Sequence, residues 1–145
     1  MEITFSNAIE IENRIENVYA YVSKLENFSI WNYAVMSVEP VENNNEESKD
    51  RYILKRDLGN VVETERVTII QTKKNQMLHF RATGGRFSYE MKYALRPFGE
   101  QTILKNVVSM KPEGIRGFML KLLKSNIQTE VNKNLYVLKQ LLENG

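Results

Sequence analysis

The sequence predicts an α+β protein in which seven antiparallel strands are followed by one long helix. Apolar and polar residues alternate in seven segments, as expected of strands with one dry face and one wet face. Gly-Asn and Gly-Gly pairs separate some of these segments and are typical of hairpin turns. From about residue 114 to residue 143 no proline interrupts a mostly helix-favouring sequence. The expected order is one strand, two short helices, six strands and the long helix.

The N-terminal part of the chain is expected to hold the first strand and both short helices. Residues 3–11 alternate between apolar and polar side chains. Asn13 is a suitable N-cap residue, and Glu16 is placed three residues later to reach back to the amide of the cap. A helix is therefore predicted from this point to about Ser23, and a second short helical turn is predicted at residues 25–31.

Six strands are expected between the short helices and the closing helix. Gly59-Asn60 is a two-residue connection whose leading glycine suits a type II′ turn, and Gly84-Gly85 turns the chain again. Successive hairpins imply an antiparallel meander. Residues 42–50 are expected to form a solvent-exposed loop. The predicted strands cover residues 33–41, 52–58, 61–72, 77–83, 87–95 and 102–110.

The closing helix has one continuous apolar stripe and a shorter second apolar face. The stripe, which we interpret as facing the core, comprises Leu120, Leu123, Ile127, Val131, Leu135, Leu138 and Leu142. The second group, on roughly the opposite side, comprises Ile115, Phe118, Met119 and Leu122. Either the helix bends near residues 124–126 and both groups meet the same interior, or the second group forms a lid, a dimer surface or a membrane-touching edge. The basic residues Arg116, Lys121 and Lys124, which lie among these apolar residues, favour the second interpretation in any of its three forms.

Composition excludes several kinds of site. The 145 residues suffice for one domain with a sizeable core, and a formal net charge of +2 is too small to indicate a nucleic-acid partner. Without cysteine, and with His79 as the only histidine, the chain lacks the usual ligands of a transition-metal centre, so neither a metal nor another cofactor is expected. No leader-like N-terminus is seen, and no apolar run approaches the ~18 residues of a membrane span. A soluble, cytoplasmic protein is therefore expected.

Several short motifs carry a resemblance to a known family. Residues 13–19 (NRIENVY) lead to residues 25–28 (LENF) and to Trp31. Residues 95–102 (LRPFGEQT) form a turn before the last strand, and residues 137–142 (VLKQLL) end the closing helix. Together with the order of elements, these motifs resemble the START-like superfamily, also called SRPBCC or Bet v 1-like, and especially its polyketide cyclase/dehydrase branch.

The resemblance covers essentially the whole chain and implies one START-like domain over residues 1–145. It implies the helix-grip fold, in which a curved seven-stranded antiparallel sheet wraps around the long C-terminal helix, with two short helices after the first strand. In relatives an apolar cavity between sheet and helix holds lipids, sterols, polyketides or hormones. Many relatives are binders and some are cyclases or aromatases. No universal catalytic residues exist in the family, so the catalytic residues of this chain stay unassigned.

Ligand-binding residues are expected on the aromatic strand at residues 87–95, at Phe80 on the strand before it, near the tryptophan and on the first turns of the closing helix. The strand side chains would fill a core in most folds, but a buried tyrosine hydroxyl needs a partner that a ligand or trapped water supplies. Trp31 and Tyr33 lie at the cavity mouth or act as packing anchors. The complete expected set is Trp31, Tyr33, Phe80, Phe87, Tyr89, Met91, Tyr93, Phe118, Met119 and Leu122.

Ionisable residues offer few further candidates. His79 is expected on the outer face of the sheet; facing inward, it would be the readiest general base in the chain. Strict alternation places Glu63 and Glu65 on an apolar face, where a carboxylate is costly unless it is paired, so we expect the strand to twist or bulge and leave both in solvent. Arg81 and Arg86 either hold an acidic group of a ligand or belong to a solvated hairpin.

Three functional hypotheses follow. The first is a binding or transport protein for a small hydrophobic molecule such as a lipid or polyketide. The second is a polyketide cyclase or aromatase in which Tyr89, Glu65 or His79 moves protons. The third is an interaction module whose extra apolar helix face contacts a partner or a membrane. The ligand, any reaction and the oligomeric state stay open.

Overall fold

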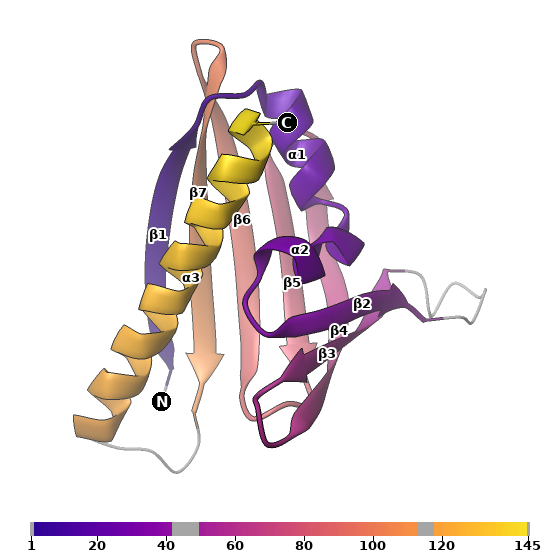
Figure 1. Ribbon diagram of the computed structural model, residues 1–145, viewed down its shortest axis with the longest axis vertical. Helices are drawn as coiled ribbons and strands as arrows, with labels where there is room; N and C mark the ends of the chain where they lie inside the picture. The colour runs from indigo at the N-terminus through magenta and orange to yellow at the C-terminus, as the bar shows by residue number, and fades with distance from the viewer. Residues whose placement is uncertain (1, 42–49, 113–117, 145) are drawn as a thin grey trace.

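The computed structural model describes residues 2–41, 50–112 and 118–144 of the chain. Within these ranges, seven strands form one antiparallel sheet, and a long helix crosses one face of it (Figure 1). The strands are β1 (Ile3–Ile11), β2 (Val35–Pro40), β3 (Arg51–Asp57), β4 (Val62–Lys73), β5 (Met77–Thr83), β6 (Ser88–Phe98) and β7 (Gln101–Lys111). The helices are α1 (Ile15–Val22), a 3₁₀ turn (Leu25–Asn27), α2 (Phe28–Trp31) and α3 (Phe118–Asn144). The predicted α+β class and helix-grip architecture are confirmed. The loop expected at residues 42–50 falls outside the described residues except at its last position, and so does the start of the closing helix.

Strands β2 to β7 form a meander, and β1 lies beside β7 at the edge of the sheet opposite β2. The strand order is β1-β7-β6-β5-β4-β3-β2, so the N-terminal strand pairs with the last one, with Phe5 opposite Val108. Gly59 and Gly84 have φ angles of +94° and +93°, a backbone conformation that favours glycine. Their hairpin turns, predicted from the sequence, are confirmed. Two register shifts, at Val35/Ser37 and Ile69/Gln71, mark bulges, which bend and twist the strands that contain them.

The core lies between the sheet and the helices. Val18 and Val22 of α1 and Leu135 and Leu138 of α3 are almost completely buried against it. Each such side chain contributes roughly 1.5–3 kcal/mol by leaving water. A second, smaller cluster, which includes Phe5, packs under the N-terminal half of α3.

The C-terminal end of α3 is tied to the N-terminal part of the chain. Asn13 donates from Nδ2 to the carbonyl oxygen of Leu142 at 2.6 Å, and Lys139 Nζ donates to the carbonyl oxygen of Glu10 at 2.7 Å. The expectation that Asn13 caps α1 is wrong, because the N-cap position is occupied by Arg14, and no side chain caps the helix. Asn13 instead connects the start of α1 to the end of α3.

Helix α3 turns its predicted apolar stripe toward the sheet, and the two described side chains of the second apolar group, Met119 and Leu122, face away from it. Met119 is 60% exposed and Leu122 is 44% exposed. The interpretation in which a bend brings both groups to the same interior is therefore wrong for these two residues, while Ile115 lies outside the described residues. Among the described helices, none has both the length and the apolarity needed to cross a membrane.

Candidate functional site

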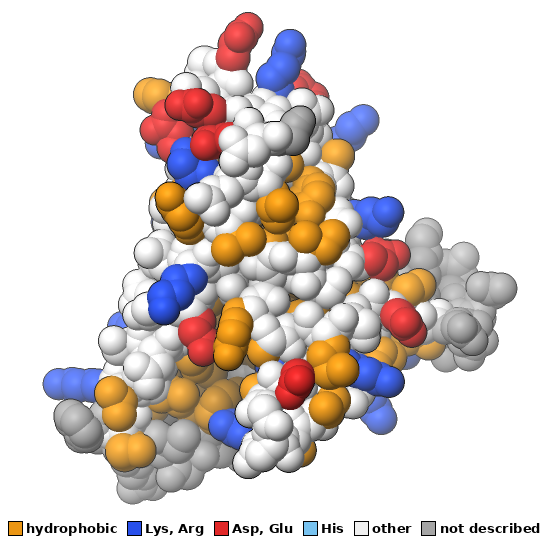
Figure 2. Space-filling model, viewed as in Figure 1, with side chains coloured by type: hydrophobic (Ala, Val, Ile, Leu, Met, Phe, Trp, Pro, Cys, Tyr) orange, Lys and Arg blue, Asp and Glu red, His pale blue; other side chains and the backbone are white. Residues whose placement is uncertain are grey.

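A cavity of about 330 Å³ lies between the N-terminal half of α3 and the sheet. In the space-filling view, a recess with hydrophobic side chains at its floor lies beside the lower half of α3 (Figure 2). The sheet contributes Tyr89, Met91, Tyr93, Val108 and Met110, and α3 contributes Leu123, Asn126, Ile127, Glu130, Val131, Asn134 and Leu135. Strands β3 and β4 of the sheet add Arg56, Glu63 and Glu65, and the remaining lining residues are Trp31, Asn32, Tyr33, Leu58, Arg86 and Phe87.

One wall of the cavity is formed by the aromatic strand β6. Because side chains alternate along a strand, Tyr89, Met91 and Tyr93 share the face toward α3, and Phe87 continues this row just before the strand begins. Asn106 of the neighbouring strand donates from Nδ2 to the sulfur of Met91 at 2.7 Å. Rings and thioethers give this wall a large, adaptable apolar surface.

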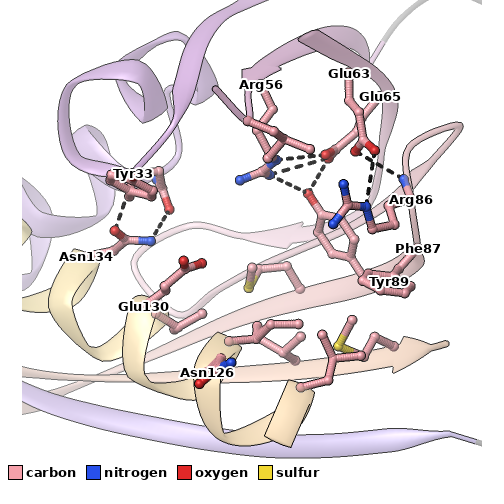
Figure 3. Close-up of a pocket in the computed structure, with 18 of the residues that line it drawn as sticks. Tyr33, Arg56, Glu63, Glu65, Arg86, Phe87, Tyr89, Asn126, Glu130 and Asn134 are labelled. Atoms are coloured by element: carbon pink, nitrogen blue, oxygen red, sulfur yellow. Dashed lines mark hydrogen bonds and ion pairs between the residues drawn. The ribbon is translucent and has the colours of Figure 1, made fainter. Parts of the chain in front are cut away.

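A buried polar cluster occupies one end of the cavity (Figure 3). Glu65 is only 4% exposed, and its carboxylate accepts hydrogen bonds from Arg56 Nε at 2.9 Å and from the Tyr89 hydroxyl at 2.6 Å. Arg56 Nη2 also donates to the Tyr89 hydroxyl at 3.3 Å. The expectation that Glu65 is left in solvent is wrong: the strand keeps its alternation through Glu65, and its bulge lies beyond it at Ile69/Gln71. The carboxylate tolerates burial because it is paired.

This environment shifts the pKa of several groups. Burial raises the pKa of Tyr89, and the negative charge of Glu65 raises it further. Burial also raises the pKa of Tyr93, although the nearby charge of Arg56 opposes that shift. For Arg56, burial lowers the pKa, but its interactions with Tyr89 and Glu65 outweigh burial and raise it overall. At neutral pH the cluster therefore contains a guanidinium cation and two protonated tyrosine hydroxyls.

The turn between β5 and β6 covers the polar cluster. Arg86 donates its backbone amide to Glu63 Oε2 at 3.1 Å and places its guanidinium 3.6 Å from the same carboxylate. A Cβ at Gly85 would lie 2.9 Å from Cγ of Glu65, so only glycine allows this close approach without a shift. Of the two arginines on either side of Gly84-Gly85, Arg86 thus lies at the cavity rim, whereas Arg81 is exposed and does not line the cavity.

Trp31 closes the inner end of the cavity. It is 2% exposed, and its ring packs edge-on against Phe28 and Tyr93, with centroid separations of 5.1 and 5.9 Å. It is therefore both a packing anchor and a lining residue. Its Nε1 is buried and has no hydrogen-bond partner among the described residues.

Next to Trp31, the segment that leads into β2 is fastened to α3 (Figure 3). Asn134 accepts a hydrogen bond from the backbone amide of Tyr33 at 3.0 Å and donates one to Asn32 Oδ1 at 3.3 Å. Ala34, which follows, has a φ of +67°, unusual for a residue with a side chain. Tyr33 itself is 71% exposed at the mouth of the cavity.

The sequence-predicted residues are only partly brought together. Those that line the cavity are Trp31, Tyr33, Phe87, Tyr89, Met91 and Tyr93. Phe80 is 1% exposed, packs edge-on against Phe28 and does not line the cavity. Met119 and Leu122 lie on the exposed side of α3, and the side chain of Phe118 is outside the described residues. His79 is on the outer face, as predicted, and contacts Glu90 at 2.9 Å.

Arg56 lines the cavity although it was not among the residues predicted from the sequence. A signal was present, because Arg56 shares the alternation of Leu54, which is buried, and therefore lies on the dry face of β3. The hairpin centred on Gly59-Asn60 pairs Arg56 with Glu63 and Leu54 with Glu65. That register brings Arg56 within reach of both glutamates.

Comparisons with known proteins agree with this architecture. The sequence matches the family described as polyketide cyclase / dehydrase and lipid transport over residues 2–143. No curated protein matches the sequence significantly. A START superfamily protein from Mycobacterium smegmatis superposes with a TM-score of 0.78 at 17% identity, covering 97% of each chain.

Two aromatase/cyclase structures are also similar. The di-domain ARO/CYC StfQ from the steffimycin biosynthetic pathway has a TM-score of 0.78 at 11% identity, covering 99% of this chain and 51% of StfQ. The Zhui aromatase/cyclase from Streptomyces sp. R1128 has a TM-score of 0.73 at 8% identity, covering 99% of this chain and 93% of Zhui. At these identities the likeness concerns the fold. The fold is therefore shared with a START superfamily protein. Because the family match spans nearly the whole chain, the protein belongs to the family described as polyketide cyclase / dehydrase and lipid transport.

Proposed function

We propose that the protein binds a small hydrophobic molecule in the cavity between α3 and the sheet, as a carrier does. The observation that supports this most is the cavity itself, about 330 Å³ of space that side chains leave unfilled. Small-molecule sites range upward from roughly 300 Å³. A protein whose aromatic strand served only as core packing would have no reason to keep such a space open.

The lining suits an elongated or flat apolar body. Met91 and Val108 from the sheet face Ile127 and Val131 from α3 across the cavity. A ligand that buried about 250 Å² of apolar surface would gain roughly 6 kcal/mol before the costs of association. The polar cluster around Arg56 would fix which end of the ligand enters first, because a small number of polar groups is enough to orient a ligand in an apolar site.

The first test is native mass spectrometry of the purified protein, with extraction of any bound molecule. A matched pair of helix variants tests the location: Ile127→Trp fills the cavity, whereas Leu122→Trp adds the same side chain at an exposed position on the same helix. We expect apolar probes or co-purified molecules to be lost from the first variant and retained by the second. Equal retention in both would refute binding at this site.

An aromatase/cyclase activity is the second candidate, supported by the Tyr89–Glu65–Arg56 cluster, which brings a hydroxyl, a carboxylate and a cation into one apolar cavity. Such groups could move protons while the walls fold a reactive chain. His79, on the outer face, no longer belongs among the candidates. Incubation with linear polyketides should then give cyclised products with the wild type and far fewer with Tyr89→Phe. Product formation unaffected by that change would exclude Tyr89 as a catalyst.

A further inference from the structure

We propose that the ligand of this cavity is an uncharged molecule that presents a carbonyl oxygen to Trp31 and Tyr93. This inference rests on the proposed binding function and names the chemical class of the ligand. It follows from hydrogen-bond donors that the protein leaves without acceptors, and from the balance of charge around them.

The indole of Trp31 is the first such donor. Its Nε1 is buried and has no partner among the described residues, although the residue lines the cavity. An indole N–H only donates, so an acceptor must come from outside the residues around it. Leaving a buried donor unsatisfied is costly, and native proteins rarely do so without a reason.

The hydroxyl of Tyr93 is the second. Tyr93 is 1% exposed, lines the same cavity and makes no side-chain hydrogen bond to any described residue. Its ring contacts that of Trp31, with centroids 5.9 Å apart. The two donors come from neighbouring rings, one on α2 and one on β6. A carbonyl oxygen has two lone pairs and accepts from two donors at once.

The charges that line the cavity argue against an anionic ligand. The cation of Arg56 is already matched by Glu65, and that of Arg86 lies against Glu63. Glu130 adds a third carboxylate at the mouth, so the lining carries two arginines and three glutamates. What the inner end has in excess is therefore neutral donors and not positive charge. Neutral donors do not suit an ammonium group either, because an ammonium group has no lone pair with which to accept a hydrogen bond.

A pair of isosteric probes tests this directly. 2-Acetylnaphthalene and 2-isopropenylnaphthalene have nearly the same shape, but only the ketone carries an acceptor. Because Trp31 is the only tryptophan, its indole N–H gives a single resolved signal in a ¹H–¹⁵N correlation spectrum of the ¹⁵N-labelled protein. We expect both probes to shift amides that line the cavity, the ketone to bind roughly five-fold more tightly, as one good hydrogen bond provides, and only the ketone to move the indole proton downfield.

Variants that lack one donor distinguish the contribution of the hydrogen bonds to probe binding from the contribution of the shape of the site. Tyr93→Phe and Trp31→Phe should each reduce the preference for the ketone, whereas Tyr21→Phe, outside the cavity, should leave it unchanged. Equal binding of the two probes without an indole shift would overturn the carbonyl inference while leaving the proposed binding function intact. Tighter binding of 2-naphthoate than of the ketone would overturn the requirement for an uncharged ligand. If no probe shifts any lining amide, the proposed function itself fails.

Discussion

Replacing Arg56 by methionine would leave the carboxylate of Glu65 buried without its cation. Methionine keeps most of the length of the arginine stem, so packing changes little, while the hydrogen bonds at 2.9 and 3.5 Å to the carboxylate are lost. Only the Tyr89 hydroxyl would remain as a donor to Glu65.

The expected cost follows from the burial of the two partners. Removing one member of a fully buried ion pair costs about 3–5 kcal/mol. Glu65 is nearly inaccessible, but the side chain of Arg56 is 26% exposed, so water already screens part of the interaction. We therefore expect a loss of about 2–3 kcal/mol in the free energy of unfolding. The double variant Arg56→Met/Glu65→Gln should recover at least half of that loss, because it removes the unpaired charge.

Urea unfolding, followed by the fluorescence of Trp31, measures both quantities. With a typical slope near 1.5 kcal/mol per molar urea, the midpoint of unfolding of the single variant should lie about 1.3–2 M below that of the wild type. A loss below about 0.5 kcal/mol, or single-variant losses that simply add in the double variant, would show that the two residues do not interact and would refute the reasoning.

Three further expectations follow from the site. Above about pH 10 the fold should lose stability, because burial holds the pKa of Tyr89 and of Tyr93 above the 10.0 of an exposed tyrosine and the unfolded chain releases protons that the folded chain keeps. Urea titrations between pH 9 and 11 should show up to about 1.4 kcal/mol per pH unit from each tyrosine, and Tyr93→Phe should remove its share. Gly85→Ala should lower the melting temperature by pushing a Cβ against Glu65, at a cost of about 1–3 kcal/mol; an unchanged melting temperature would mean that the turn moves freely. Phe80→Leu should cost about 1–2 kcal/mol in chemical unfolding but leave probe affinity unaltered, and weakened binding at full stability would assign Phe80 to the site instead.

Much of the fold was predictable because it depends on local patterns. Alternation located the strands, and the Gly-Asn and Gly-Gly pairs located the hairpins, since few other residues adopt the φ of +94° found at Gly59. The apolar stripe of α3 predicted which side meets the sheet, and Leu135 and Leu138 are fully buried there. These features need no knowledge of distant contacts.

The polar end of the site was less predictable because it depends on pairs between strands. Because burying a carboxylate is costly, Glu65 was predicted to lie in solvent. It is buried because Arg56 and Tyr89, from two other strands, pair with it. The alternation that put Phe80 on the dry face was right, but a dry face does not tell which of its residues meet a cavity and which meet other side chains. That distinction depends on how the helices cover the sheet.

The two ends of α3 are held in different ways, and this has a consequence for how the protein could diversify. Backbone and side-chain hydrogen bonds from Asn13, Glu12 and Lys139 fix its last turns, whereas before Gln128 the described part of the helix makes no side-chain hydrogen bond to the sheet. Of the seven residues that line the cavity from α3, Leu123, Asn126 and Ile127 lie in this less constrained portion. Substitutions there would alter ligand preference without breaking the attachment on which folding depends, so a single helix offers one segment for selection to vary and another for it to preserve.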